Sequence, residues 1–289
     1  MAKKEAQYKE KINWKKEALL LPGYLIVTLW ILFAAAILFW ILGASLSTSK
    51  EIFSGQVFKF ESGFHFENYM SAWKAQNVSK FFGNSLLYAT VSSVCVILIA
   101  APAAYALARF DFVGNKAIRF IMILSLSIPA VMITIPLYAI TARIGLSGRV
   151  LLIILYTCMN VPYTTTYLLN FFSTLSKTYE EAAAIDGCTP MKVFWKIMFP
   201  LIQPALITVT VFNFLGVWNE FFMSLVFASS EKYTPVGVGL LNIVNAMKYS
   251  GDYGGLFAAV VIVFLPTFLL YIFMSEKIIS GITGGGVKG

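Results

Sequence analysis

Long apolar runs alternate with short polar segments along almost the whole chain. Six of these runs reach the roughly 20 residues that an α-helix needs to cross the hydrocarbon core of a bilayer. They are Leu21–Leu46, Asn84–Ala108, Ile118–Ala142, Val150–Phe172, Leu201–Phe227 and Leu256–Ser275. A segment that faces lipid must satisfy its own backbone hydrogen bonds, so we expect each run to be helical. The pattern therefore predicts an all-α, polytopic membrane protein with six transmembrane helices.

Composition strengthens this prediction and excludes several other classes of protein. Hydrophobic residues make up 58% of the 289 residues and charged residues only 12%, a ratio that would leave a soluble domain with large apolar patches. The net charge of +8 comes from basic residues that flank the apolar runs, which favours a membrane protein over a nucleic-acid binder. With a single histidine, His65, and three scattered cysteines, we expect neither a metal site nor a disulfide framework.

The distribution of Lys and Arg predicts that both chain termini lie in the cytoplasm. With the amino terminus inside, fourteen of the 22 basic residues fall in cytoplasmic segments, as the positive-inside rule requires. This orientation divides the chain into a basic cytoplasmic tail (1–20), a first transmembrane helix (21–46), an extracytoplasmic loop (47–83), a five-helix core (84–277) and a glycine-rich cytoplasmic tail (278–289).

A few polar or amphipathic side chains interrupt the apolar spans. They are Asn160, Asn213 and the consecutive residues Trp218, Asn219 and Glu220. Each can serve interhelical packing or line a polar translocation path, and the sequence leaves both interpretations open. Transporters driven by proton or sodium gradients usually carry buried carboxylates or broken half-helices. Because Glu220 is the one carboxylate among these residues, we expect the energy for transport to come from elsewhere.

The segment 173–200, between the fourth and fifth runs, has a helical pattern of its own. Thr178 followed by Glu181 predicts a capping box at the start of a first helix, and Glu180 beside Glu181 suits the positive end of the helix dipole. Three alanines favour this helix, and Gly187 suits the left-handed residue beyond its end.

A second helix is predicted directly after the glycine. Pro190 fits its first position, and Val193, Phe194 and Ile197 fall on one face. We expect Pro200 to end this helix. A segment of this kind suits docking into a groove of another protein, although a solvated re-entrant loop fits these features equally well.

The spacing within this segment resembles a known sequence motif. Glu181-Ala182-Ala183, then Gly187, then Ile197-x-Phe199-Pro200 is similar to the EAA loop of bacterial ATP-binding-cassette importer permeases. Phe199 stands where that family usually has Leu, and both side chains are bulky and apolar.

Other parts of the chain resemble the carbohydrate branch of the same family. Asn84-Ser85-Leu86, Trp218-Asn219-Glu220-Phe221 and the tail Gly281–Gly289 are similar to the smaller, maltose-type permease subunit, so the resemblance covers the chain from about Asn84 to its end. It implies a non-enzymatic permease subunit, in the bacterial inner membrane, that imports a carbohydrate, most simply an oligosaccharide.

The resemblance also implies partners and residue roles. A homologous second permease would complete a heterodimer, two cytoplasmic ATPase subunits would hold ATP and Mg, and an extracytoplasmic binding protein would deliver the solute, at the loops 47–83 or 229–255. This chain has no P-loop and would bind no cofactor. The residues implied to couple to the ATPase are Glu180, Glu181, Ala182, Ala183, Asp186 and Gly187. Those implied to touch the ATPase from the tail are Gly285, Gly286 and Lys288.

Two alternatives remain open on the sequence. One is an importer permease for another polar solute, such as a polyol phosphate. An anionic solute would favour basic side chains inside the spans. With Arg119 counted among the cytoplasmic charges, none falls within the spans, which favours a neutral polyol or sugar. The other is a stand-alone secondary transporter, which would work without ATP and without partners.

Overall fold

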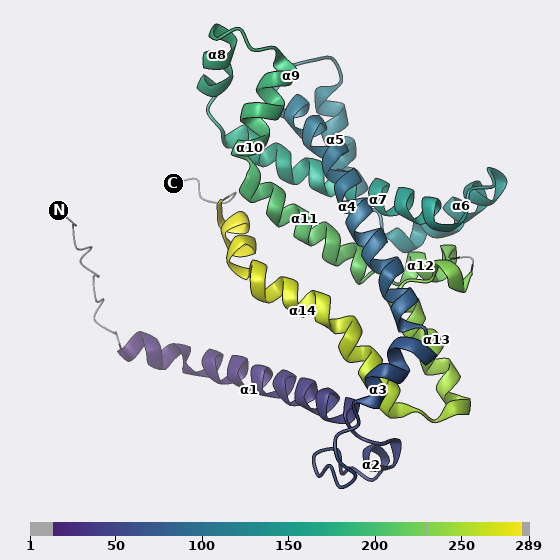
Figure 1. Cartoon of the computed structure of the whole chain (residues 1–289). Coiled ribbons are helices and arrows are strands. Elements are labelled where there is room, and N and C mark those ends of the chain that lie inside the picture. The colour runs from purple at the N-terminus through teal and green to yellow at the C-terminus, as the bar shows by residue number, and fades with distance from the viewer. Residues whose placement is uncertain (1–13, 229, 285–289) are drawn as a thin grey trace.

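The computed structural model describes residues 14–228 and 230–284, and these residues form helices and connecting segments without any strand. The predicted all-α class is confirmed. Within the described residues the elements are α1 (Trp14–Ser45), α2 (Ser49–Phe53), α3 (Glu67–Met70), η1 (Ser71–Ala75), α4 (Val78–Arg109), α5 (Asn115–Ser125), α6 (Ala130–Arg143), α7 (Gly148–Thr174), α8 (Thr178–Ile185), α9 (Pro190–Val193), η2 (Phe194–Met198), α10 (Phe199–Leu201), α11 (Gln203–Trp218), α12 (Phe222–Phe227), η3 (Glu231–Tyr233), α13 (Val236–Ser250) and α14 (Tyr253–Gly284). Figure 1 shows α4 running along the body of the molecule, with α1 and α14 extending to one side of it and α6 to the other.

Three unbroken helices are long and apolar enough to cross a membrane. They lie at Leu19–Ser45, Val78–Arg109 and Tyr253–Glu276. Two further pairs of helices, each joined at a bend, are long and apolar enough when each pair is taken as one span, so the described residues hold three to five candidate spans rather than the six predicted. The helix α7 is 27 residues long, but Asn160 and the three threonines that follow Tyr163 lower its apolar character. The predicted polytopic architecture is thus confirmed, while the geometry of two spans differs from the prediction.

The third predicted run, Ile118–Ala142, is not one straight helix. It consists of α5 and α6, which meet at an angle of 103°. Pro129 is the N-cap residue of α6, with extended backbone angles, and it has no N–H to continue the hydrogen bonds of α5. A proline also disfavours helical geometry at the residue before it, so the helix stops in the segment 126–129.

The fifth predicted run, Leu201–Phe227, is interrupted twice. The helical segment Pro190–Leu201 meets α11 at 76°, and Pro204 occupies the first turn of α11, where its missing N–H has no cost. The run breaks again after Trp218, and α12 begins at Phe222. The carboxylate of Glu220 supports this second break, as described below.

The centre of the molecule is formed by α4 packed along α7, with α11 against α4 and α14 against α11. The first helix, α1, is different, because it packs mainly on α14 and lies apart from the remaining helices (Figure 1). Its apolar window is 0% buried. The helix α8 lies at one end of the molecule, and α2, α3 and the far end of α13 lie at the other (Figure 1). We call these the α8 end and the α2 end.

Candidate functional site

The segment between α7 and α11 forms the helix–turn–helix that the sequence predicts, but it starts differently. Thr178 is the first residue of α8 rather than its cap, and the predicted capping box is absent. The backbone N–H of Thr178 instead donates to Ser176 Oγ at 3.2 Å. The N-cap residue is Lys177, which makes no side-chain capping bond, so the N–H of Thr178 is satisfied by the residue that precedes the cap.

The turn after α8 is built around Gly187. Its φ of +74° is left-handed, which costs a residue with a Cβ about 1–2 kcal/mol. The N–H of Cys188 donates to Ala183 O at 2.9 Å and that of Gly187 to Ala184 O at 3.1 Å. This pair of bonds is the Schellman motif, and it satisfies the last carbonyls of α8. The prediction that Gly187 sets this turn is confirmed.

The second helix starts at Pro190, as predicted, but it does not end at Pro200. It passes through the π-helical turn η2 and ends at Leu201. In the π-helical turn η2 each carbonyl accepts from the N–H five residues ahead instead of four. The hydrogen-bond register therefore shifts by one residue just before Pro200, which has no N–H to donate. The bend therefore falls at Ile202, the N-cap residue of α11.

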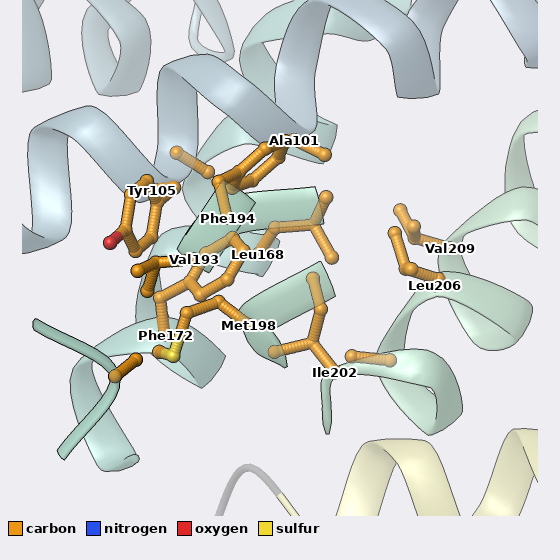
Figure 2. Packing of buried hydrophobic residues seen from close by; sticks show 13 residues of the cluster. Ala101, Tyr105, Leu168, Phe172, Val193, Phe194, Met198, Ile202, Leu206 and Val209 are labelled. Atoms are coloured by element: carbon orange, nitrogen blue, oxygen red, sulfur yellow. The ribbon is translucent and has the colours of Figure 1, made fainter. Parts of the chain in front are cut away.

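An apolar cluster fixes this segment to the transmembrane helices. Figure 2 shows Tyr105 of α4, Phe172 of α7 and Phe194 of η2 gathered around one point. The ring of Tyr105 lies 5.4 Å from that of Phe172 and 5.1 Å from that of Phe194, centroid to centroid. Ala183 of α8 is buried in the same cluster. The helix α8 therefore shares one close-packed interior with α4 and α7, and such interiors transmit strain.

An ion pair adds a second attachment that the sequence did not reveal. Arg109, the last residue of α4, donates from Nε to Glu180 Oε1 at 3.1 Å. A second bond runs from its Nη2 to Leu175 O at 2.9 Å. The Arg109 side chain is 6% exposed, so Glu180 compensates a buried charge. Glu180 thus faces inward in this structure, although the sequence grouped it with the docking residues.

The remaining docking candidates face outward. Glu181, Ala182, Asp186 and Gly187 are exposed, whereas Ala183 is buried. Exposed apolar side chains surround them: Ile185 is 87% exposed, and Tyr179, Met191 and Trp195 are also exposed. An exposed apolar surface of this kind at the tip of a helical hairpin is typical of an interaction site.

Two of the five translocation-path candidates lie inside the helix packing. Asn213 is buried and exchanges two hydrogen bonds with Thr164 of α7, at 3.0 and 3.2 Å. Trp218 is 2% exposed and donates from Nε1 to Val263 O of α14 at 3.2 Å. Asn160 is half-buried, and its amide donates back to Tyr156 O at 2.7 Å.

Glu220 is the centre of a hydrogen-bond network. Its carboxylate accepts from the backbone N–H groups of Met223 and Ser224 at 2.6 and 3.0 Å, and so caps α12. The hydroxyl groups of Ser224 and Tyr156 also donate to it, at 2.9 and 3.1 Å. The neighbouring Asn219 is exposed and donates to Leu215 O. The network explains why an acidic residue lies in an apolar run, and the role of these five residues in transport stays a prediction.

At the α2 end, Asn84 ties α4 to the segment after α12. Its buried amide donates to the carbonyls of Lys232 and Thr234 at 3.0 and 2.9 Å, and its Oδ1 accepts from Arg149 at 3.1 Å. Ser85 accepts the backbone N–H of Val236 at 2.9 Å. These bonds give a structural reason for the Asn84-Ser85 pair that sequence resemblance had singled out.

A polar groove lies beside this attachment, between η1, the start of α4 and α13. We call it the outer groove. Its volume is about 560 Å³, and its polar lining residues are Ser71, Gln76, Asn77, Glu231, Asn242, Ser250 and Asp252. Gln76 donates to Asp252 at 2.9 Å, while its Oε1 is buried without a partner. Loops 47–83 and 229–255, which the sequence proposed for docking, both contribute to this groove. The tail candidates Gly285, Gly286 and Lys288 lie outside the described residues.

Comparison with known proteins identifies related chains. Residues 93–275 match the family described as "Binding-protein-dependent transport system inner membrane component". The diacetylchitobiose uptake system permease protein NgcG of Streptomyces coelicolor is 32% identical over 264 residues, which cover 91% of this chain and 87% of that protein. The sulfoquinovosyl glycerol transport system permease protein SmoH of Agrobacterium fabrum is 33% identical over 257 residues, which cover 86% and 87%.

The fold matches a solved structure as well. A crystal structure of a bacterial ABC transporter involved in the import of the acidic polysaccharide alginate contains a chain with a TM-score of 0.80 and 22% identity. The match covers 93% of this chain and 99% of that one.

Proposed function

Since the chain belongs to the family of binding-protein-dependent transport system inner membrane components, we propose that it imports an oligosaccharide and that separate ATPase subunits drive this import. Relatives named for uptake of a disaccharide and of a sugar glycerol conjugate support a carbohydrate substrate. The observation that carries the proposal is the exposed tip of α8. It presents Glu181, Ala182 and Ile185 to the outside, while Ala183 fixes the helix to the transmembrane core.

In this mechanism the α8 tip sits in a cleft of a cytoplasmic ATPase that carries ATP and Mg. When the ATPase pair closes, it displaces α8, and the packing of Phe194 against Tyr105 and Phe172 passes the displacement to α4 and α7. A homologous permease forms the other half of the translocation path. In this proposal the α8 end lies on the cytoplasmic side, and the basic flanks of the apolar runs support cytoplasmic termini.

The α2 end then faces the solute-binding protein. The outer groove offers amide and carboxylate groups, which are the side chains that bind sugar hydroxyl groups. Glu231 and Asp252 give it a negative lining, so a neutral saccharide fits it better than an anionic one.

A purification from the native membrane in mild detergent tests the proposal. We expect a P-loop ATPase, a second permease and nucleotide hydrolysis that a solute-binding protein and its sugar stimulate. A chain that purifies alone and transports a solute in liposomes without ATP would contradict the proposal and support a stand-alone transporter. A recovered complex that responds to an amino acid or polyol phosphate would keep the importer and overturn the carbohydrate assignment.

A further inference from the structure

Arg119 lies near the start of the apolar helix pair formed by α5 and α6, and it has no acidic partner among the described residues. It is the fifth residue of α5, about 6 Å along the helix from its start. In the part of the chain that the structure describes, no carboxylate lies within ion-pair distance of it. Its Nη2 donates to the backbone carbonyl of Leu107, but its Nε is buried and has no hydrogen-bond partner. A buried guanidinium N–H without an acceptor is costly, so this site calls for an acceptor from outside the chain.

A second unpartnered group faces the same space. Thr165 of α7 is 1% exposed, and its hydroxyl has no hydrogen-bond partner. Its two neighbours differ, since Thr164 bonds to Asn213 and Thr166 bonds back to Pro162 O at 2.9 Å. Thr165 is thus the member of the threonine triplet whose hydroxyl remains available.

Arg119 and Thr165 line one cavity of about 230 Å³, which we call the Arg119 cavity. This space exceeds the roughly 30 Å³ that one water molecule occupies in the liquid. Thr166 and Asn170 complete its polar side, and Leu107, Met122, Ile123 and Leu169 form its apolar walls. A guanidinium group and a hydroxyl group on residues that line one space match an acceptor-rich anion, and phosphate oxygens are the usual partner of Arg in such a site.

The surroundings of the cavity favour a lipid as the source of this phosphate. Apolar side chains cover the rest of α5 and are strongly exposed: Phe120 by 65%, Ile121 by 60%, Ile123 by 56% and Leu124 by 49%. Acyl chains can lie along this surface while the headgroup enters the cavity. The cavity is at the α8 end, because Arg119 bonds to Leu107, two residues before the Arg109 that pairs with Glu180. We propose that the Arg119 cavity binds the phosphate headgroup of an anionic phospholipid from the leaflet on the α8 side.

The first test uses the intact, wild-type complex in nanodiscs. Phenylglyoxal modifies free guanidinium groups, and peptide mass spectrometry reports the modification of Arg119. We expect protection in nanodiscs that contain phosphatidylglycerol and modification in nanodiscs of phosphatidylcholine alone. Protection in both would mean that the cavity does not select an anionic headgroup over the zwitterionic phosphocholine or that a protein group fills it, and modification in both would mean that it is empty. Either result would overturn the proposal. Equal protection by inorganic phosphate in phosphatidylcholine nanodiscs would identify a free-anion site and overturn the lipid assignment.

The second test measures phosphatidylglycerol retained by the detergent-purified complex in native mass spectrometry. We expect Arg119→Gln and Thr165→Val to weaken retention, with roughly a tenfold or larger effect for Arg119→Gln. Lys116→Gln is the matched control, since it removes the same charge from an exposed position of α5 and should retain the lipid. Arg119→Lys keeps the charge but loses Nε, so we expect partial retention even if the Gln variant fails to fold. Equal retention in the wild type and all variants would refute the site. ATPase coupling in the same preparations reports the proposed function separately.

Discussion

At the scale of single residues, two neighbouring glutamates have opposite surroundings. Glu180 is directed inward and compensates the buried Arg109, whereas Glu181 is exposed and its side chain has no hydrogen bond or ion pair within the described residues. Sequence alone grouped them, because both lie in the first turn of α8 and both suit its dipole. Their difference depends on Arg109, which is 71 residues away along the chain, and no local pattern contains that information.

We therefore predict that the two glutamates respond differently to the same substitution. Glu181→Gln should leave thermal stability unchanged and weaken association with the ATPase, since it alters only the exposed surface. Glu180→Gln should destabilise the purified permease by about 1–3 kcal/mol, because it leaves the buried Arg109 without its counter-charge. Thermal unfolding and co-purification of the ATPase measure the two effects. A loss of stability in Glu181→Gln matching that of Glu180→Gln would rule out the assigned difference.

At the scale of elements, local signals predicted the helix–turn–helix well and the breaks in the spans poorly. Gly187 and Pro190 act through the backbone of their own turns, so their effects could be read from sequence. Pro129 and Pro136 both lie in the third run, yet only the first marks a break, while Pro136 lies inside α6. Neighbouring helices decide which proline a membrane helix tolerates, and the sequence does not reveal those neighbours.

The same limit applies to Glu220. A single carboxylate in an apolar run suggested a polar path, but in the structure it caps α12 and bonds to Tyr156 of α7. The sequence contained a local sign of this role, since Glu220 lies at the start of a short helical stretch. The hydroxyl of Tyr156 could not be foreseen, because it is contributed by another helix.

The turn after α8 gives a prediction about the whole element. Gly187→Ala meets open space around the new methyl group, so its cost is backbone strain of about 1–2 kcal/mol at a φ of +74°. We expect the turn to relax, α8 to change direction and sugar uptake to fall while ATP hydrolysis continues. Gly83→Ala is the control, because Gly83 also has open space around it but lies within the helix α4. Equal uptake in both variants would count against the role of this turn.

The loop after α1 predicts a response to acid. Glu51 accepts hydrogen bonds from the N–H groups of Thr48 and Ser62 and from the Ser62 hydroxyl, and these bonds lower its pKa to about 2. The lowered pKa means that the ionised form stabilises the folded loop. That contribution is complete above the unfolded-state pKa of about 4.3 and is lost as the pH falls towards 2.

We therefore expect faster hydrogen exchange at the amides of Thr48 and Ser62 at pH 3 than at pH 6, after correction for intrinsic rates. The variant Glu51→Gln should exchange faster at pH 6 already and show little further change. Equal protection of the wild-type loop at both pH values would show that the carboxylate does not hold it.

At the scale of the whole molecule, the two candidate surfaces lie at opposite ends and share the helix α4. This helix begins at Val78, beside the outer groove, and ends at Arg109, which holds α8. Asn84 fixes it to the segment before α13, and Tyr105 fixes it to the α8 segment. The helix α4 is therefore a continuous packed element that can couple the binding of the solute-binding protein to the ATPase.

This arrangement predicts a particular pattern in a double-mutant cycle. Asn242→Ala removes an exposed amide of the outer groove, and Glu181→Gln changes the α8 tip. Because the sites share no contact, their effects on unfolding free energy should add within about 0.5 kcal/mol. Their effects on transport should not add, since both sites act in one cycle of binding-protein stimulation and ATP hydrolysis.

We expect Asn242→Ala to reduce the stimulation of ATPase by the sugar-loaded binding protein while the ATPase stays bound. Val244→Ala, on the same helix outside the groove, is the control. Additivity in uptake as well as in stability would show that the two ends work independently and that α4 carries no coupling between them.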